Sequence, residues 1–306
     1  MRLTISEILK TIVFLFLVLH LNHSLQAQPN RFRVISYNIL DGFNGGKDTI
    51  RQKKTAAWIN SQHADVVALQ ELVGYTDDRL QSEALQWGHK YSVLLKKTGY
   101  SVGLTSDKPI KVISRATKGF WHGMLHCQVN NINFFVVHFS PDDYKIRGGE
   151  ADSIINLVKR SLNEKQECVV LGDFNAHSPF DDDIDATRPL LLKSYIESDQ
   201  KSEKYKHLDH DHWDYSVVGK FLGIQMIDVC QRFVPVDKRY SYSTPILIPR
   251  YRKNLEHVLQ TRERLDYLFV TPGLSRKCIN AYIHNGVETS NLSDHYPLMA
   301  DFEELE

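Results

Sequence analysis

The chain lacks an excess of charge of either sign, because its 37 Lys and Arg residues are balanced by 37 Asp and Glu residues. Proteins that bind nucleic acid indiscriminately rely on an excess of Lys and Arg to contact phosphates. The balance therefore argues against a protein that coats or degrades polyanions in bulk, although it allows a local basic patch.

The chain also lacks an apolar run of membrane-spanning length. The run from Ile12 to Leu19 is far shorter than the roughly 20 residues that a transmembrane helix needs. It lies close to Arg2 and Lys10 and precedes a stretch of small residues, which is the pattern of a secretory signal peptide. We therefore expect residues 1–27 to be a signal peptide and residues 28–306 to be the mature protein, exported to the periplasm or the medium without a permanent membrane span.

Cysteine is scarce, and the four cysteines form no C-x-x-C pair, which excludes the usual zinc and redox motifs. They are Cys127, Cys168, Cys230 and Cys278. An exported protein can form disulfides, and four cysteines allow three complete pairings among which the spacing does not choose.

Internal repeats, low-complexity tracts and flexible linkers are absent from the sequence, which excludes an array of small modules. The mature length suits one large α/β domain. Apolar positions recur near every 3.6 residues in Arg51 to Ser61 and Tyr144 to Leu162 but not in Arg33 to Leu40 or Asn131 to Phe139. This alternation of helix and strand patterns predicts an α/β sandwich.

Residues 176–263 differ in composition from the rest of the chain. They contain an acidic cluster, a polar helix-like segment and an aromatic-basic run from Arg239 to Lys253. Because loops on a rigid sheet often carry specificity, we expect a substrate-facing variable region here, with an ordinary cover for the sheet as the alternative. The metal-capable cluster from His207 to Asp214 lacks a regular ligand spacing and is more typical of a solvated loop.

What the chain does contain is a set of short polar motifs at the ends of apolar runs. In chain order they are Ser36-Tyr37-Asn38, Gln70-Glu71, His138, Gly172-Asp173-Phe174-Asn175, Arg264-Leu265-Asp266-Tyr267 and Ser293-Asp294-His295. Each is weak evidence alone, since a dipeptide such as Gly-Asp is ordinarily a turn. Sites often form at strand ends, so the ordered set together predicts a metal-dependent phosphoesterase site.

The carboxylates and amides of these motifs suit a hard cation and a phosphate. Glu71 ends an apolar run, and Mg²⁺ prefers one or two carboxylates together with water. Asn38 adds a ligand without charge, with a turn-forming Asn as the alternative. Asp173 and Asn175 lie two residues apart, so in an extended segment both point to one face, where one can orient water and the other can donate to the phosphate.

The imidazoles supply candidate proton carriers and donors. His295 stands beside Asp294, and Asp266 opens another apolar run; a buried Asp can fix the tautomer of a histidine that acts as a general base. His138 is a candidate donor to a non-bridging phosphate oxygen, with a core histidine as the alternative. Arg147 is a weaker candidate for a phosphate contact.

These motifs resemble those of the endonuclease/exonuclease/phosphatase superfamily, which includes pancreatic deoxyribonuclease, abasic-site endonucleases, neutral sphingomyelinases and inositol polyphosphate 5-phosphatases. The resemblance spans about residues 31–304. It implies a deoxyribonuclease-I-like α/β fold, a four-layer α/β/β/α sandwich of two mostly antiparallel sheets flanked by helices, with the site at one edge.

The resemblance also implies roles for the individual residues. The residues that bind metal or support it would be Glu71, Asn38 and Asp294. The residues that position water, donate to the phosphate or carry the proton would be Asp173, Asn175, His138, Asp266 and His295. Members of the superfamily differ on whether the histidine that corresponds to His295 or the aspartate that corresponds to Asp173 takes the proton from water. We expect His295 to do so.

Some residues of this chain depart from the motifs of particular branches of the superfamily, which reduces the number of branches that it resembles. Glu71 is followed by Leu72-Val73, whereas abasic-site endonucleases usually continue with Thr-Lys, and His138 stands where they usually carry Tyr. Deoxyribonucleases pair that histidine with an earlier Glu, which residues 91–122 do not supply. The pattern is shared with sphingomyelinase-like members, although no apolar hairpin is evident that would insert into lipid.

We therefore expect an exported Mg²⁺- or Mn²⁺-dependent hydrolase, most consistent with a phosphodiesterase of the sphingomyelinase/nuclease-like branch. Its partner would be a phosphoester substrate, with nucleic acid among the candidates, and a monomer is favoured. One alternative is a phosphatase or phospholipase-like enzyme acting on a phosphorylated lipid, inositol or sugar. Another is an inactive binding protein of the same fold.

Overall fold

Two six-stranded sheets form the centre of residues 31–304, the part of the chain that this computed structural model describes. The predicted signal peptide, residues 1–27, lies outside the described residues. The first sheet has the order β11 (Cys278–Ile283), β12 (Leu298–Glu303), β1 (Arg31–Asn38), β2 (Val66–Gln70), β4 (Gly103–Ser106) and β3 (Tyr91–Leu94). The second has the order β5 (Lys111–Ala116), β6 (Met124–Val129), β7 (Ile132–His138), β8 (Cys168–Asp173), β10 (Asp266–Val270) and β9 (Ile227–Asp228).

Most neighbouring strands are antiparallel, and each sheet contains one parallel pair, β1 with β2 and β7 with β8. Parallel neighbours need a long crossover connection. The helices α3 (Thr49–Gln62) and α5 (Tyr144–Asn163) make these two crossovers, and they are the two helices expected from the sequence.

The remaining helices are shorter. They are α2 (Leu40–Gly46), α4 (Asp77–Ala84), α6 (Asp182–Ala186), α7 (Pro189–Lys201), α8 (Ser216–Gly223), α9 (Val229–Phe233), α10 (Leu255–Gln260) and α11 (Pro272–Lys277). Single 3₁₀ turns are η1 (Leu85–Trp87), η2 (Pro179–Asp181), η3 (Val236–Lys238) and η4 (Pro245–Leu247).

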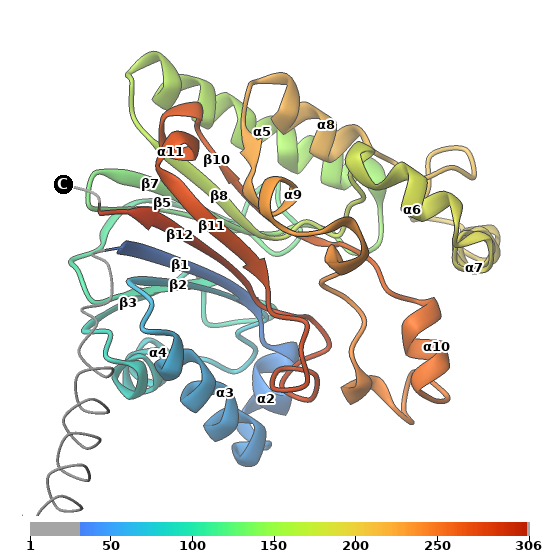
Figure 1. Ribbon diagram of the computed structural model, residues 1–306, viewed down its shortest axis with the longest axis horizontal. Coiled ribbons are helices and arrows are strands. Elements are labelled where there is room, and N and C mark those ends of the chain that lie inside the picture. The colour runs from blue at the N-terminus through green and yellow to red at the C-terminus, as the bar shows by residue number, and fades with distance from the viewer. Residues whose placement is uncertain (1–30, 305–306) are drawn as a thin grey trace, which may run out of the picture. The chain divides into compact units, whose positions relative to one another are not determined.

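The apolar residues form three layers of core, which fix the stacking of the elements. Phe32 and Val34 of β1 face the second sheet in the central layer, whereas Ile35 and Tyr37 face away from it in the layer that contains Trp58 of α3. The other outer layer joins the second sheet to α5 and α8. Side chains alternate between the faces of a strand, so the fold is the predicted four-layer α/β/β/α sandwich, with α3 and α4 on one outer face and α5 and α8 on the other (Figure 1).

The four cysteines are all buried and unpaired. Cys127, Cys230 and Cys278 lie in the core between the sheets, and Cys168 lies in the core beneath α5. Each is therefore a small core residue in this structure rather than half of a disulfide.

Residues 176–263 contribute both to the sandwich and to its surface. In α8, Val217, Val218 and Phe221 are buried against the second sheet, so this part of the segment belongs to the core. Tyr195 and Tyr242 instead line a cleft at one end of the sheets. Within residues 31–304, no helix combines the length and apolar character that crossing a membrane requires.

Candidate active site

Three predicted site residues lie side by side because three strands of the second sheet are in register. His138 at the end of β7 is paired with Asp173 at the end of β8, and Asp173 is paired with Asp266 at the start of β10. Residues paired across neighbouring strands present their side chains on the same face. The sheet thus places an imidazole and two carboxylates in a row.

Asn38 joins this row to the first sheet. It ends β1, is fully buried, and its Nδ2 donates both to Glu71 Oε1 at 3.1 Å and to Asp173 Oδ2 at 3.0 Å. Its Oδ1 accepts from the backbone N–H of Leu40 at 3.1 Å. The amide therefore orients two carboxylates from different sheets, which an exposed turn residue could not do.

Glu71 is held by its backbone as well as by its side chain. It follows β2 with φ of 62°, a region that non-glycine residues rarely occupy and that often marks a functional position. Its Oε2 accepts from the backbone N–H of Asp41 at 2.7 Å. Beside Asp41, Gly42 also has positive φ, and an added Cβ would lie 2.2 Å from the Val73 carbonyl oxygen, so only glycine allows this loop to reach the carboxylate.

His295 and Asp266 form a buried dyad. Nδ1 of His295 donates to Oδ2 of Asp266 at 2.7 Å, and the Asp266 backbone N–H donates to Ser241 Oγ at 3.0 Å. Burial opposes the charged imidazolium, yet Asp266 and Asp173 together raise the pKa of His295 well above its ordinary value. Nε2 lies 3.6 Å from Asp173 Oδ2.

Asp173 lies between the two imidazoles. Its Oδ2 is 3.5 Å from Nε2 of His138 as well as 3.6 Å from Nε2 of His295. Burial raises the pKa of Asp173 to about 7. Asn175, whose φ is 47°, donates its backbone N–H to Asp173 Oδ1 at 2.9 Å and its Nδ2 to the Phe139 carbonyl at 3.1 Å.

Glu71 and Asp294 are two buried carboxylates in the lining of the same cleft. Burial and then the charge of Asp294 raise the pKa of Glu71 to about 7, and burial raises the pKa of Asp294 as well. Ser293 Oγ donates to the Asn38 carbonyl at 2.7 Å and so ties the loop of Asp294 to β1. Buried carboxylates with raised pKa values fit a divalent cation, which would neutralise both.

Another group of potential ligands is Asp173, Asp266 and His295, whose donor atoms lie within 4.8 Å of one another. Within it, the facing atoms of Asp266 and His295 already hydrogen-bond to each other. A metal there would have to replace that bond. Glu71 and Asp294, supported by Asn38, therefore stay the predicted metal ligands.

These side chains surround a cleft of about 500 Å³. Its lining consists of Glu71, Tyr100, Trp121, His122, His138, Pro141, Asp142, Asp173, Asn175, Tyr195, His207, Tyr242, Leu265, Asp294 and His295. Four of these residues are acidic, and neither Lys nor Arg is among them. The cleft is therefore rich in aromatic rings and negative charge.

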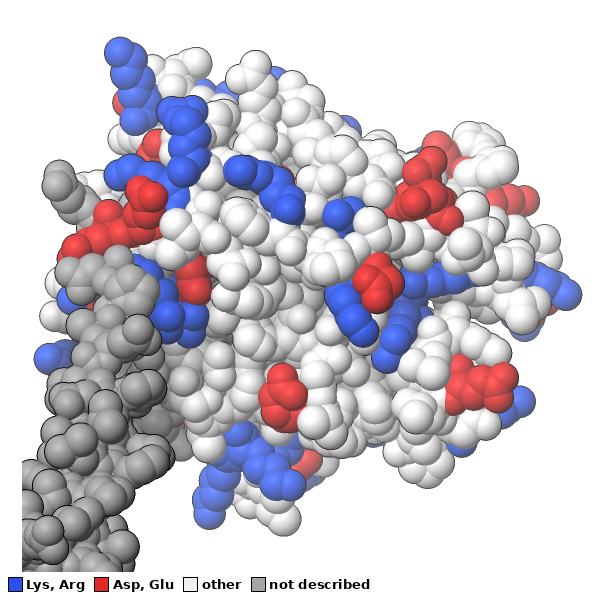
Figure 2. All heavy atoms as spheres, viewed as in Figure 1, with Lys and Arg blue, Asp and Glu red and all other residues white. Residues whose placement is uncertain are grey.

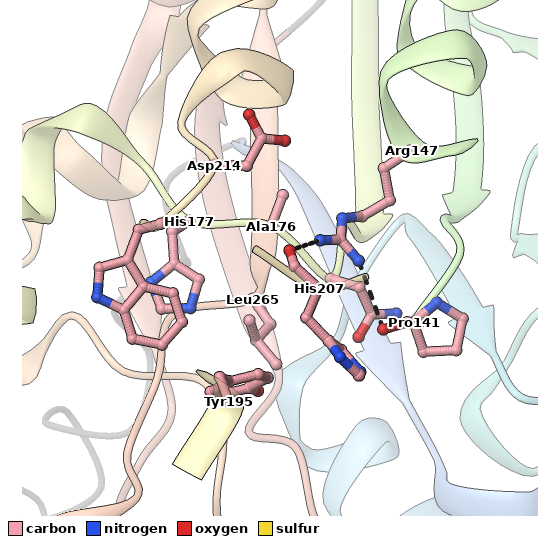
Figure 3. Close-up of a pocket in the computed structure, with 10 residues that line it drawn as sticks. Pro141, Arg147, Ala176, His177, Tyr195, His207, Asp214 and Leu265 are labelled. Atoms are coloured by element: carbon pink, nitrogen blue, oxygen red, sulfur yellow. Dashed lines mark hydrogen bonds between the residues drawn. The ribbon is translucent and has the colours of Figure 1, made fainter. Parts of the chain in front are cut away.

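Arg147 does not line this cleft, and its contact with phosphate stays a prediction. Its guanidinium is buried and donates to backbone carbonyls, Nη1 to Ser140 at 3.1 Å and Nη2 to His207 at 2.8 Å. It borders a neighbouring cavity of about 30 Å³ beside Trp213 and Asp214 (Figure 3). In this position the arginine holds two loops together.

The His207–Asp214 cluster also serves the fold. Nδ1 of His207 forms a hydrogen bond with Asp199 at 2.7 Å. Asp214, which precedes α8, accepts a hydrogen bond from the backbone N–H of Ser216 at the start of that helix. Within the described part of the chain, the cluster forms no group of three potential metal ligands. Of its members, His207 lines the cleft.

Several cleft residues belong to none of the predicted motifs. They are Tyr100, Trp121, His122 and Asp142, and all lie in connections, where no periodic pattern distinguishes a cleft residue from another surface residue. Tyr195 and Tyr242 also line the cleft, and they fall within residues 176–263, which were expected to face the substrate. In the motif Arg264-Leu265-Asp266-Tyr267, Arg264 is buried and pairs with Asp181 and Asp228 at 2.6 and 2.5 Å, so it supports the fold beneath the dyad.

Comparisons with known proteins agree with the fold. An AP endonuclease from Archaeoglobus fulgidus superposes with a TM-score of 0.64 at 16% identity, covering 89% of this chain and 99% of its own. A variant of the 3′ phosphatase NExo from Neisseria, bound to a product DNA hairpin, gives 0.62 at 15% identity over 89% and 99%. The 3′-5′ exonuclease NExo from Neisseria meningitidis gives 0.60 at 16% identity over 89% and 100%.

At these identities the likeness concerns the fold alone. No curated protein sequence matches the chain significantly. The profile of the endonuclease/exonuclease/phosphatase family matches residues 35–295, a span that contains every predicted site motif. The chain therefore belongs to the endonuclease/exonuclease/phosphatase family and is a metal-dependent phosphoester hydrolase.

Proposed function

We propose that this protein is a phosphodiesterase that uses Mg²⁺ or Mn²⁺ and an activated water. One observation carries the choice of a diester: the cleft lining contains four carboxylates and no Lys or Arg. A monoester dianion or a polyphosphate would meet several like charges and no Lys or Arg side chain, whereas a diester carries one negative charge. Coulomb repulsion in a partly buried cleft is strong enough to make this difference.

The residues that would hold the cation are Glu71, Asp294 and Asn38. Burial raises the pKa of both acids, and the charge of Asp294 raises that of Glu71 further, so a cation would stabilise their ionised forms; oxygen ligands suit Mg²⁺. The cation would supply neutralisation of the charge that develops on phosphate oxygens.

The proton is handled by the chain's own side chains. Asp266 holds His295 in the tautomer that leaves Nε2 toward the cleft. The neighbouring carboxylates raise the pKa of His295, and a cation beside Asp294 would oppose the charged imidazolium, so that His295 in its neutral form takes the proton of the attacking water. Asp173, 3.6 Å from Nε2, orients the water and is the alternative acceptor. His138 and Asn175 donate to phosphate oxygens.

We also propose to which branch of the family the protein belongs and which class of substrate it hydrolyses. Leu72-Val73 after Glu71, and His138 in place of Tyr, support a sphingomyelinase/nuclease-like enzyme over an abasic-site endonuclease. A DNA hairpin bound to a protein of similar fold supports nucleic acid as one candidate. On the face shown in Figure 2, basic and acidic side chains are interspersed, which favours a short or small diester over a long polyanion. We further propose that the protein is exported, because residues 1–27 have the sequence pattern of a signal peptide.

The experiment uses residues 28–306 with Mg²⁺, Mn²⁺ or EDTA against plasmid DNA, RNA, sphingomyelin, inositol phosphates and bis(p-nitrophenyl) phosphate. We expect cation-dependent turnover of a diester, lost in His295→Ala and kept in Asp152→Asn, a surface substitution beside Lys220. Turnover confined to monoesters would favour the phosphatase alternative. A folded protein inactive on the whole panel would contradict the proposal.

A further inference from the structure

Two histidines stack face to face in the wall of the cleft. The rings of His122 and His138 lie with centroids 4.2 Å apart and an interplanar angle of 29°, and both line the cleft. His138 ends β7, whereas His122 lies in the connection between β5 and β6. Tyr100 continues the wall, 5.2 Å from the ring of His122.

The ring nitrogens of His122 are open to the cleft. His122 is only 8% exposed and lines the cleft, and it hydrogen-bonds to no residue of the described chain. Within residues 31–304, Nδ1 of His138 is buried without a partner, whereas its Nε2 lies 3.5 Å from Asp173 Oδ2. Polar side-chain atoms normally have a hydrogen-bond partner or water, so the nitrogens of His122 are placed to bind a ligand in the cleft.

The connection that carries His122 is anchored. The backbone N–H of Trp121 donates to Glu150 Oε1 at 2.6 Å, and Glu150 Oε2 accepts the N–H of Ser140 at 2.8 Å. One buried carboxylate of α5 thus fixes the segments next to both histidines. The pair is positioned before any substrate arrives, which lowers the ordering cost of binding.

Both imidazoles are neutral near pH 7. Burial, and then the positive charge of Lys96, lowers the pKa of His122 to about 4, and burial lowers the pKa of His138 well below its ordinary value. A neutral imidazole offers one N–H donor and one acceptor. Such donors suit the oxygens of a singly charged diester in a cleft whose lining contains neither Lys nor Arg.

We propose that His122 is a substrate-binding residue that, paired with His138, donates a hydrogen bond to an oxygen of the phosphodiester. The inference rests on the proposed function and extends it, because the family motifs assign a role to His138 and none to His122. The stacking holds the two rings in one wall, so that they act on neighbouring oxygens of the same phosphate group.

The test compares His122→Phe, which keeps a stacking ring without nitrogen, with His122→Ala in the mature protein. We expect kcat/KM for bis(p-nitrophenyl) phosphate to fall roughly 10- to 100-fold in both, as when a hydrogen bond to a charged group is lost. Added imidazole should restore part of the activity of His122→Ala and none of that of His122→Phe. Wild-type kcat/KM in folded His122→Phe would overturn the proposal.

The chain offers a matched control in His126→Phe. His126 is also 8% exposed, and it stacks on Phe135 with centroids 4.1 Å apart. It lies on β6 outside the cleft lining. We expect its substitution to leave kcat/KM unchanged, and a loss equal to that of His122→Phe would overturn the proposal by showing that packing alone matters.

A binding measurement separates failure of this inference from failure of the proposed function. Ring ¹⁵N chemical shifts are recorded in the wild-type protein while dimethyl phosphate, a slowly hydrolysed diester, is added. Shifts of His122 and His138 with a constant His126 support the pair even if no hydrolysis is found or a variant fails to fold. No shift at His122 at saturating dimethyl phosphate overturns it.

Discussion

Nδ1 of His295 donates to Oδ2 of Asp266 at 2.7 Å, and both side chains are buried. The two residues come from different elements, the start of β10 and the loop before β12. The bond fixes the ring so that Nε2 lies on the side of Asp173 and the cleft. An oriented imidazole of this kind is what general-base catalysis requires.

Asp266→Asn tests the orientation of the dyad. The amide keeps the shape but can hold His295 in the wrong tautomer, so we expect kcat to fall roughly 10²- to 10⁴-fold with little change in KM. Steady-state kinetics on bis(p-nitrophenyl) phosphate measures both constants. A kcat within about threefold of wild type, beyond the scatter of a surface control such as Asp152→Asn, would contradict the role.

Glu71→Gln tests the metal site by stability rather than by turnover. Mg²⁺ at 100 times its Kd should raise the free energy of unfolding of the wild type by about 2.7 kcal/mol, and the variant should lose most of this gain. Without metal the variant should be at least as stable as the wild type, because it removes a carboxylate whose pKa burial and Asp294 have raised. Thermal unfolding with Mg²⁺ or EDTA measures both effects.

The control for this experiment is Glu197→Gln, which removes an exposed carboxylate on α7. It should keep the full stabilisation by Mg²⁺. Equal stabilisation of wild type and Glu71→Gln would place the cation elsewhere, with the group of Asp173, Asp266 and His295 as the next candidate.

His177 makes the stability of the protein depend on pH. Burial opposes its charged form, but hydrogen bonds to Asp185 and Glu263 at 2.9 and 3.2 Å outweigh burial and raise its pKa to about 9. The folded state therefore holds a proton that the unfolded chain releases near pH 6.5. This contribution is complete below about pH 6.5 and is lost as the pH rises through about 9.

His177→Gln should accordingly destabilise the protein most at low pH. We expect a deficit of about 3–5 kcal/mol at pH 6, as when one partner of a buried ion pair is removed, and a smaller deficit at pH 10. Urea unfolding followed by tryptophan fluorescence measures it. The exposed His210, which pairs with Asp209, provides the control His210→Gln, and a deficit for His177→Gln that stays constant from pH 6 to 10 would contradict the assignment.

Glu150→Gln tests the anchor beneath the cleft wall. Both carboxylate oxygens of Glu150 accept hydrogen bonds, from the backbone N–H groups of Trp121 and Ser140. In the variant an amide NH₂ group replaces one of these oxygens and cannot accept, so one of the two hydrogen bonds is lost. We expect the free energy of unfolding to fall by about 1–3 kcal/mol and KM to rise, because the segment before His122 loosens. A variant with wild-type stability and KM would show that the two segments are held in other ways.

The fold was predictable where strands and helices left a periodic pattern. Buried residues on both faces of β1 and β8, and the 3.6-residue spacing in α5, reflect the layers that each element contacts. The assignment of two mostly antiparallel sheets came from the resemblance of the motifs, because alternation of helix and strand is equally compatible with a single parallel sheet.

The site was predictable in part for a similar reason. Asn38, Asp173 and His138 are the last residues of strands, so their side chains were expected near one sheet edge. His122 and Tyr100 lie in connections whose path depends on anchors such as the bond from Trp121 to Glu150, and no local pattern encodes such a path. The buried position of Arg147 could not be predicted, because a guanidinium that binds backbone carbonyls has the same sequence signature as one that binds phosphate.

The preference for a diester is tested most directly by the ratio of kcat/KM for bis(p-nitrophenyl) phosphate to that for p-nitrophenyl phosphate, measured with Mg²⁺ and with EDTA in the wild type and His295→Ala. We expect the wild type with Mg²⁺ to prefer the diester, and we expect EDTA or the loss of His295 to abolish turnover. A preference for the monoester, or turnover that survives both EDTA and His295→Ala, would contradict this expectation.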